Sequence, residues 1–168
     1  MDFVALILGN LFSLLAMFTD SWSASQKTAK KVLEVQLLSQ FSYGASSFVL
    51  GGYSAVAQNV VSALRNLAAI RNIRNAALEW ILVGTGVVLG LAFNNLGFMG
   101  LLPVIASTQY SLAIFRFRDN ERALKISFMI SCVLFTVFNL VILNIVGVVT
   151  NTVIVISTAV NLWKTGKA

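Results

Sequence analysis

Residues 56–66 read VAQNVVSALRN and residues 148–158 read VVTNTVIVIST, and these two stretches decide the fold of the chain. Each places an asparagine, Asn59 or Asn151, inside an apolar run of helical length, and the two lie 151 − 59 = 92 residues apart. A buried amide without a partner costs about 2 to 7 kcal/mol. The same costly residue in two similar helices therefore predicts a duplicated unit whose copies share a polar interior.

The composition is that of an integral membrane protein. Hydrophobic residues make up 58% of the 168 residues, and charged residues make up only 11%, against roughly 25% in soluble domains. There is no histidine, one cysteine (Cys132) and six carboxylates, which excludes a histidine metal site, a Cys–His nucleophile pair and a disulfide. We therefore predict no metal, no cofactor and no enzymatic activity.

The positive charge indicates a lipid surface as the partner. The net charge is +6, but the basic residues are dispersed in short clusters beside apolar segments, which favours a lipid bilayer over nucleic acid. The first apolar run follows Met1-Asp2 and precedes Lys27 and Lys30. That order is the reverse of an export signal, so we expect the run to remain as a membrane helix.

Seven apolar segments are long enough to cross a bilayer, because a spanning helix needs about 20 mostly apolar residues and at least about 17. The fold class predicted is all-α, a polytopic membrane protein with seven transmembrane helices. The predicted spans are 3–19, 32–50, 54–70, 77–94, 97–115, 123–143 and 145–163.

Basic residues occur at alternate junctions between these spans. Positive charge gathers on the cytoplasmic side of a membrane, so the pattern predicts a bacterial inner membrane protein with its N-terminus outside and its C-terminus in the cytoplasm. Trp22, Trp80 and Trp163 fall at the predicted cytoplasmic ends, as interface anchors do. The basic residues at these junctions are Lys27, Lys30, Lys31, Arg71, Arg74, Arg116, Arg118, Arg122, Lys125, Lys164 and Lys167.

The first three and last three spans have the same layout: a helix, a basic loop, a helix, a short outer turn and a helix. An offset of 91 to 92 residues matches Lys31 with Arg122 and Asn59 with Asn151. One extra span between the triplets gives both the same orientation, a parallel 3+1+3 arrangement in a single membrane domain, 1–168. Its predicted parts are a first triplet (1–74), a linker helix (75–95) and a second triplet (96–168).

With this layout and an asparagine in the third and seventh helices, the chain resembles the SWEET and SemiSWEET transporters of the PQ-loop (MtN3) superfamily, which are built from parallel repeats. In chain length and in its general pattern of apolar and polar residues, it is more similar still to bacterial inner-membrane proteins of the YgjV type. The resemblance implies a sugar-type pocket lined by Asn59 and Asn151. The chain departs from the family pattern in having one proline, Pro103, and Thr108-Gln109 where relatives have Pro-Gln.

Polar residues follow one face of the third and seventh spans. Asn59, Ser62 and Asn66 are spaced i, i+3 and i+7, and Asn151 and Thr158 are spaced i and i+7, so each set shares a helix face. These groups must meet one another, water or a ligand; the alternative to a pocket is hydrogen bonding between helices, worth about 0.6 kcal/mol on average. The candidate substrate-binding residues are Asn59, Asn151, Ser62, Asn66, Tyr43 and Thr158.

The second span is more polar than its counterpart, the sixth. Gln36, Gln40, Tyr43 and Ser47 recur on one face, so we predict an asymmetric cavity that is more polar in the first triplet. Tyr43 either stacks on a ring of the solute or packs between helices.

Apart from Lys125, which borders the start of the sixth span, Arg65 is the only basic residue predicted inside a span. Its side chain either extends to the cytoplasmic interface or contacts an anionic or carbonyl-bearing solute. Asp20 and Glu34 are expected near the same interface, where they offset the basic loops. No carboxylate is expected at the midplane, which favours passive movement over proton coupling.

Gly86 and Gly90 form a GxxxG spacing in the fourth span, which indicates close packing within the chain or a homodimer. Two functions remain open on the sequence. The first is a facilitative transporter of a small polar solute, sugar-like or vitamin-like, bound between the triplets. The second is a non-transporting scaffold or partner subunit with a dry interior, in which Asn59 and Asn151 bond each other.

Overall fold

The computed structural model describes residues 2–24, 26, 29–71, 73, 75–117 and 120–165. Within these residues it contains seven helices and no strand, which confirms the all-α prediction. Lys27, Arg74, Arg118 and Lys167 of the predicted charge pattern lie outside the described residues. The helices are α1 (Phe3–Ala24), α2 (Ala29–Val49), α3 (Tyr53–Ile70), α4 (Ala76–Ala92), α5 (Leu101–Arg116), α6 (Glu121–Val141) and α7 (Ile145–Thr165).

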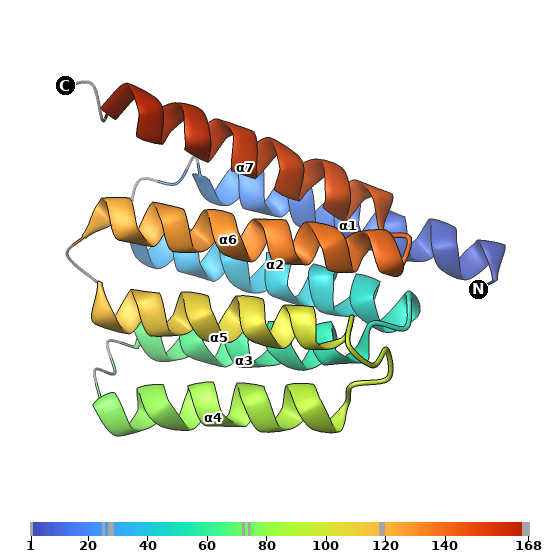
Figure 1. The fold of residues 1–168 in the computed structure, drawn as a ribbon, viewed down its shortest axis with the longest axis horizontal. Coiled ribbons are helices and arrows are strands. Elements are labelled where there is room, and N and C mark those ends of the chain that lie inside the picture. The colour runs from blue at the N-terminus through green and yellow to red at the C-terminus, as the bar shows by residue number, and fades with distance from the viewer. Residues whose placement is uncertain are drawn as a thin grey trace.

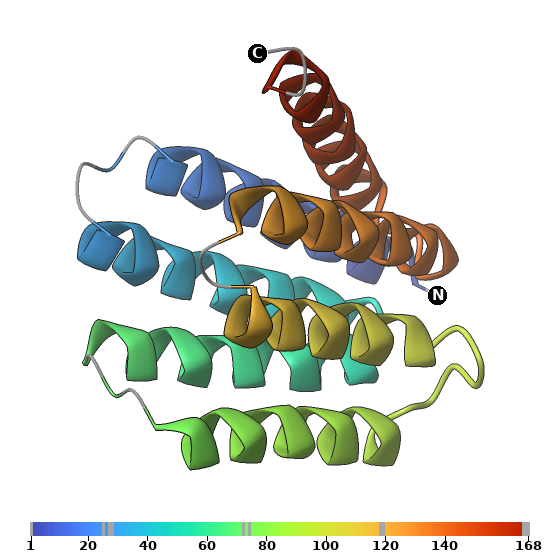
Figure 2. The same cartoon turned by 60° about the vertical axis from the view of Figure 1, so that its left-hand side comes forward.

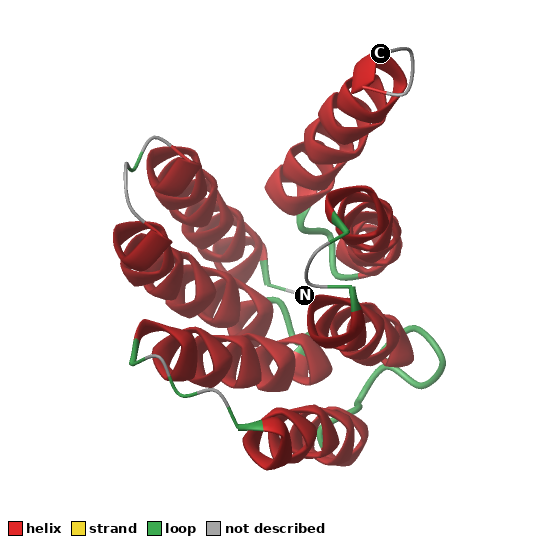
Figure 3. Ribbon diagram, turned by 90° about the vertical axis from the view of Figure 1, so that its left-hand side faces the viewer, coloured by secondary structure: helices red, strands yellow, loops and turns green. Residues whose placement is uncertain are grey.

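Six of these helices form a ring. α1, α2 and α3 pack in chain order, as do α5, α6 and α7, while α3 meets α5 and α1 meets α7. α4 lies outside the ring, against α3 and α5 (Figure 3). The α1–α2, α3–α4 and α5–α6 junctions are at the same end as the C-terminus (Figure 1), which we call the inner end. The opposite end, from which α1 projects, is the outer end.

Four of the six helix boundaries of the two halves, α1–α3 and α5–α7, repeat at one offset. α2 and α6 begin 121 − 29 = 92 residues apart and end 141 − 49 = 92 apart, and α3 and α7 begin 145 − 53 = 92 apart. α1 and α5 end 116 − 24 = 92 apart but begin 101 − 3 = 98 apart, and α3 and α7 end 165 − 70 = 95 apart. The predicted match of Asn59 with Asn151 has the offset of the four repeated boundaries, whereas the match of Lys31 with Arg122 is at 91.

Two short outer turns join α2 to α3 and α6 to α7, as predicted. Gly51 has φ 76° and Leu143 has φ 57°, the left-handed conformation that ends many helices. The Gly52 amide donates to the Ser47 carbonyl at 2.7 Å, which closes the first of these turns.

The α4–α5 connection is longer than predicted. Asn94 donates to the Gly97 carbonyl at 2.8 Å and accepts from the Leu96 amide at 3.1 Å, so this asparagine organises a loop where the sequence predicted helix from residue 97. α5 begins at Leu101. Pro103 therefore lies in the first turn, where its missing N–H breaks no helical hydrogen bond and produces no hinge.

The interior is polar and the surface is apolar. Ser13, Ser39 and Ser46 are 0% exposed, whereas the phenylalanine rings of Phe41 and Phe48 are 69% and 63% exposed. This is the reverse of a protein surrounded by water, and it fits a chain whose outer surface meets lipid.

By length and composition, two described helical segments could cross a membrane, Phe3–Ser23 and Arg122–Val141, and Ala76–Ala92 and Ile145–Val160 are shorter apolar helices. The second and third predicted spans are less apolar because they carry polar residues such as Ser39 and Gln58, which are buried inside the ring.

Apolar packing joins the two halves at the outer end. Leu50, Ala55, Phe138 and Ile142 form a buried cluster against which Leu6, Leu96 and Leu102 pack. This cluster joins α2 and α3 of one half to α6 of the other.

Hydrogen bonds between the halves also concentrate at the outer end. The Asn10 side chain donates to the Leu143 carbonyl and accepts from the Val146 amide, both at 3.1 Å. Asn95 donates to the Gly51 carbonyl at 2.8 Å. Toward the inner end α7 diverges from its neighbours (Figure 2), so the ring is least tightly joined there.

Candidate functional site

A cavity of about 190 Å³ lies inside the ring, between the two halves. That volume is below the roughly 300 to 1,000 Å³ of pockets for drug-sized ligands, so it suits a small solute. Its polar or aromatic lining comes from the first half (Asp20, Gln40, Tyr43, Ser47, Gln58, Asn59, Ser62, Arg65) and from the second (Ser107, Tyr110, Phe128, Ser131, Phe135, Asn139, Asn144, Asn151).

The lining repeats with the helix boundaries. Five pairs of lining residues are separated by the same offset of 92, so the halves present equivalent positions to one space. In four of the five pairs the residue types differ. The pairs are Gln40 with Cys132, Tyr43 with Phe135, Ser47 with Asn139, Asn59 with Asn151 and Ser62 with Ile154.

Asn59 and Asn151 both line this cavity and are partly exposed to it. Among the described residues, neither side chain makes a hydrogen bond to protein, and the two amides do not bond each other. The scaffold hypothesis required that bond. Both amides are therefore available to water or to a solute.

Four of the six predicted site residues line the cavity: Asn59, Asn151, Ser62 and Tyr43. Asn66 is buried but does not line it, and Thr158 also lies outside it. Each of these two is seven residues farther along its helix than the lining asparagine. At 1.5 Å per residue this is about 10 Å nearer the inner end, so sharing a helix face was not enough to bring them to the site.

Tyr43 lies near the carboxylate of Asp20. The Asp20 side chain interacts with the hydroxyl groups of Tyr43 and Ser39, and Thr19 and Ser39 pair their hydroxyl oxygens at 3.0 Å. Ser39 is the central residue of α2, because Ala29–Val49 has 21 residues. Asp20 therefore lies beside the middle of α2.

That Asp20 lies near the inner interface and offsets the basic loops stays a prediction, because Asp20 is only four residues from the end of α1. α1 does not end at residue 19 but continues to Ala24, and the Asp20 side chain lines the cavity. The sequence argument for uncoupled movement did not foresee this carboxylate in the cavity lining.

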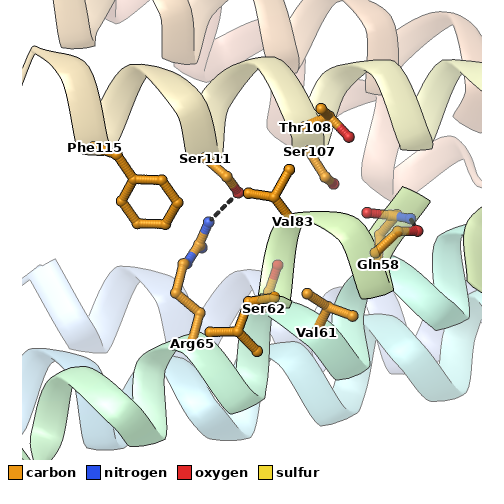
Figure 4. Close-up of a pocket in the computed structure, with 11 residues that line it drawn as sticks. Gln58, Val61, Ser62, Arg65, Val83, Ser107, Thr108, Ser111 and Phe115 are labelled. Carbon is orange, nitrogen blue, oxygen red and sulfur yellow. Dashed lines mark hydrogen bonds between the residues drawn. The ribbon is translucent and has the colours of Figure 1, made fainter. Parts of the chain in front are cut away.

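Arg65 turns inward, so the prediction that it extends to the interface is wrong. Its Nη1 donates to the Ser111 Oγ at 3.1 Å on the adjacent helix α5 (Figure 4). Its guanidinium carbon lies 6.0 Å from the centre of the Tyr110 ring, within range of a cation–π interaction. No described carboxylate lies within the 4.0 Å of an ion pair.

A crevice of about 10 Å³ lies beside Arg65, between α3, α4 and α5 (Figure 4). This is about the volume that one water molecule needs, so it is no second solute site. Next to it Gln58 donates to the Gly86 carbonyl at 2.8 Å, and a Cβ on Gly90 would lie 2.5 Å from the Gln58 amide nitrogen. The GxxxG face of α4 is therefore covered within the chain.

Gln109 joins helices and does not line the cavity. It donates to the Ser131 Oγ at 2.6 Å and to the Ser127 carbonyl at 2.9 Å, and accepts from the Ser127 Oγ at 2.7 Å. Because its amide is satisfied on both sides, this residue fixes α5 to α6.

Sequence reasoning missed six polar or aromatic contributors to the cavity: Gln58, Ser107, Tyr110, Phe128, Phe135 and Asn144. Asn144 was assigned to a turn, yet it lines the cavity and donates to Ser46 at 3.4 Å. Ser107 and Tyr110 are on α5, whose polar residues lacked a match in α1 at the expected spacing. No pattern in the sequence separated them from interhelical residues.

A protein-family model, Imp-YgjV, described as bacterial inner membrane protein, matches residues 7–168. No curated protein matches the chain, and no solved structure does.

Proposed function

The chain belongs to the Imp-YgjV family of bacterial inner membrane proteins, and from that premise we propose that it is a facilitative transporter of a small polar solute. The solute occupies the cavity between the two halves. The observation that supports this most is the pair of matched asparagines, Asn59 and Asn151, which line one cavity without protein partners.

We propose that all seven helices cross the membrane as a parallel 3+1+3 arrangement similar to that of SWEET transporters. The helices have 16 to 22 residues, or about 24 to 33 Å at 1.5 Å per residue, close to the roughly 30 Å of a hydrocarbon core. The repeated boundaries and the polar interior support this arrangement. A reporter that is active only in the cytoplasm should be active when fused after residue 168, and activity only of a periplasmic reporter would contradict it.

Alternating access supplies the mechanism. In the described conformation the halves are joined at the outer end by the cluster around Phe138 and by the hydrogen bonds of Asn10 and Asn95. Solute release to the outside requires these contacts to break while the inner ends of the halves approach. Hydrogen bonds from Asn59 and Asn151 replace part of the hydration shell in either state.

The test is flux into proteoliposomes with a panel of xylose, glucose, glycerol, erythritol and small amino acids. At least one probe should enter faster than into empty vesicles. The variant Asn59→Ala/Asn151→Ala should slow that probe at least about tenfold, as expected when two hydrogen bonds of about 1 kcal/mol or more are lost. Asn66→Ala is the matched control, because this buried asparagine on α3 does not line the cavity. Equal flux in empty and loaded vesicles for every probe would overturn the proposal.

A further inference from the structure

Two charged residues break the symmetry of the cavity lining. Adding 92 to Asp20 gives Leu112, and adding 92 to Arg65 gives Ser157. Both charges are therefore in the first half, and the second half lines the same cavity with aromatic and neutral polar residues. The cavity therefore contains one carboxylate and one guanidinium that have no charged equivalent in the second half.

These two charges lie at the same depth. Asp20 interacts with Ser39, five residues inward from Gly44 on α2. A Cβ on Gly44 would lie 3.7 Å from the Asn59 Cβ, so Gly44 and Asn59 are level. Because α2 and α3 run antiparallel, the residue level with Ser39 on α3 is five residues inward from Asn59, at 59 + 5 = 64, next to Arg65.

Neither charge has an oppositely charged partner among the described residues. The Asp20 carboxylate interacts with two hydroxyl groups, those of Ser39 and Tyr43. The Arg65 guanidinium has the Ser111 hydroxyl and the face of Tyr110. Removing a charge from water costs several kcal/mol unless an opposite charge compensates it, and neutral partners compensate only in part.

We propose that the cavity binds a zwitterion, a solute of zero net charge that carries one carboxylate and one ammonium group. Arg65 binds the carboxylate, for which a guanidinium offers paired donors, and Asp20 binds the ammonium group. This inference rests on the proposed function and narrows its solute from the sugar-like class to the amino-acid class.

Other solute classes fit the two charges less well. A simple anion is repelled by Asp20, a simple cation is repelled by Arg65, and a sugar leaves both charges without an opposite charge. The volume of about 190 Å³ suits a small amino acid. Tyr110, Phe128 and Phe135 offer rings to its carbon chain, and the amides of Asn59 and Asn151 offer further hydrogen bonds.

Competition and flux with matched probes test this in proteoliposomes of the full chain. Glycine, β-alanine and γ-aminobutyrate vary the distance between the two charges. Glycinamide lacks the carboxylate, N-acetylglycine lacks the ammonium group, and erythritol lacks both. At least one zwitterion should be preferred about tenfold or more over all three single-charge or neutral probes, since hydrogen bonds to charged groups contribute about 1.5 to 3 kcal/mol each.

Two variants assign the charges. Arg65→Gln should abolish the preference for the zwitterion over the probe that lacks a carboxylate while retaining the preference over N-acetylglycine. Asp20→Asn should do the reverse. Each readout is a ratio of two probes in one preparation, so it does not depend on how much of the variant folds. Arg65→Lys, which keeps the charge, should restore part of the lost preference.

Three results would overturn the inference. Erythritol or a sugar moving as fast as every zwitterion would overturn it and leave transport standing. Unchanged probe ratios in both variants would show that Asp20 and Arg65 neutralise each other across the cavity. If no probe crosses, equilibrium dialysis of the detergent-purified protein with the labelled zwitterions decides: binding supports the site and overturns transport, whereas absence of binding overturns both.

Discussion

The two halves of the ring share four helix boundaries at an offset of 92 residues but use one matched buried position differently. Ser46 on α2 and Phe138 on α6 are 92 residues apart, and both are 0% exposed. Ser46 pairs with Ser13 at 2.8 Å between hydroxyl oxygens, which joins α1 to α2. Phe138 packs in the apolar cluster at the outer end. A repeated backbone thus leaves one half free to carry polar groups and the other to carry the apolar cluster.

The joints inside each half differ in the same way. In the first half, two hydroxyl pairs join α1 to α2, Ser13 with Ser46 and Thr19 with Ser39, and the Asp20 carboxylate interacts with Ser39 and Tyr43. In the second half, the Gln109 side chain makes several bonds to α6. Removing Gln109 should therefore have a larger effect than removing one hydroxyl pair of the first half.

The largest effect is expected for Phe138→Ala. Truncating a fully buried phenylalanine removes its contacts and leaves a cavity, which costs about 3 to 5 kcal/mol in free energy of unfolding. Denaturant unfolding of the purified protein in mild detergent measures this. Phe41→Ala is the control, because its ring is 69% exposed. Equal losses of unfolding free energy in both variants would contradict the importance of the buried Phe138 cluster for stability.

A smaller loss is expected for Gly90→Ala on α4, which belongs to neither half. The added Cβ would lie 2.5 Å from both the Gln58 Nε2 and the Val104 Cγ2, and such overpacking costs about 1 to 3 kcal/mol. Gly84→Ala should be neutral or slightly stabilising, because nothing lies within 4 Å of its Cβ position. Thermal unfolding measures the stability of both variants in parallel. A loss of stability in Gly84→Ala as large as that in Gly90→Ala would contradict the described packing of α4.

Gln109→Leu should destabilise the second half by about 1 to 2 kcal/mol, because it leaves the buried Ser127 and Ser131 hydroxyls with fewer partners. The change in unfolding midpoint measures this. An unchanged midpoint would show that the hydrogen bonds of Gln109 contribute no net stability.

The smallest effect is expected for Ser13→Ala, which removes the hydroxyl pair of Ser13 with Ser46 between α1 and α2. One interhelical hydroxyl pair contributes about 0.6 kcal/mol, so the unfolding midpoint should shift less than for Gln109→Leu. A larger shift for Ser13→Ala would reverse the comparison between the halves.

The sequence was sufficient for features that depend on local apolar length and spacing. Apolar runs located all seven helices, and the positions of Asn59 and Asn151 located the cavity. The sequence did not predict that Asp20 lines the cavity, because the apolar rule ended the first span at residue 19, whereas α1 continues to Ala24. The direction of Arg65 depends on Ser111 and Tyr110, which are more than forty residues away in the chain and which no local pattern could identify.

The two outer turns also match at the offset of 92, since 51 + 92 = 143. Gly51 adopts its left-handed conformation without penalty, but Leu143 adopts the same conformation with a side chain, which costs about 1 to 2 kcal/mol. The α6–α7 turn thus holds backbone strain that the α2–α3 turn lacks. Leu143→Gly should remove this strain and raise the unfolding midpoint, which thermal unfolding in mild detergent would measure.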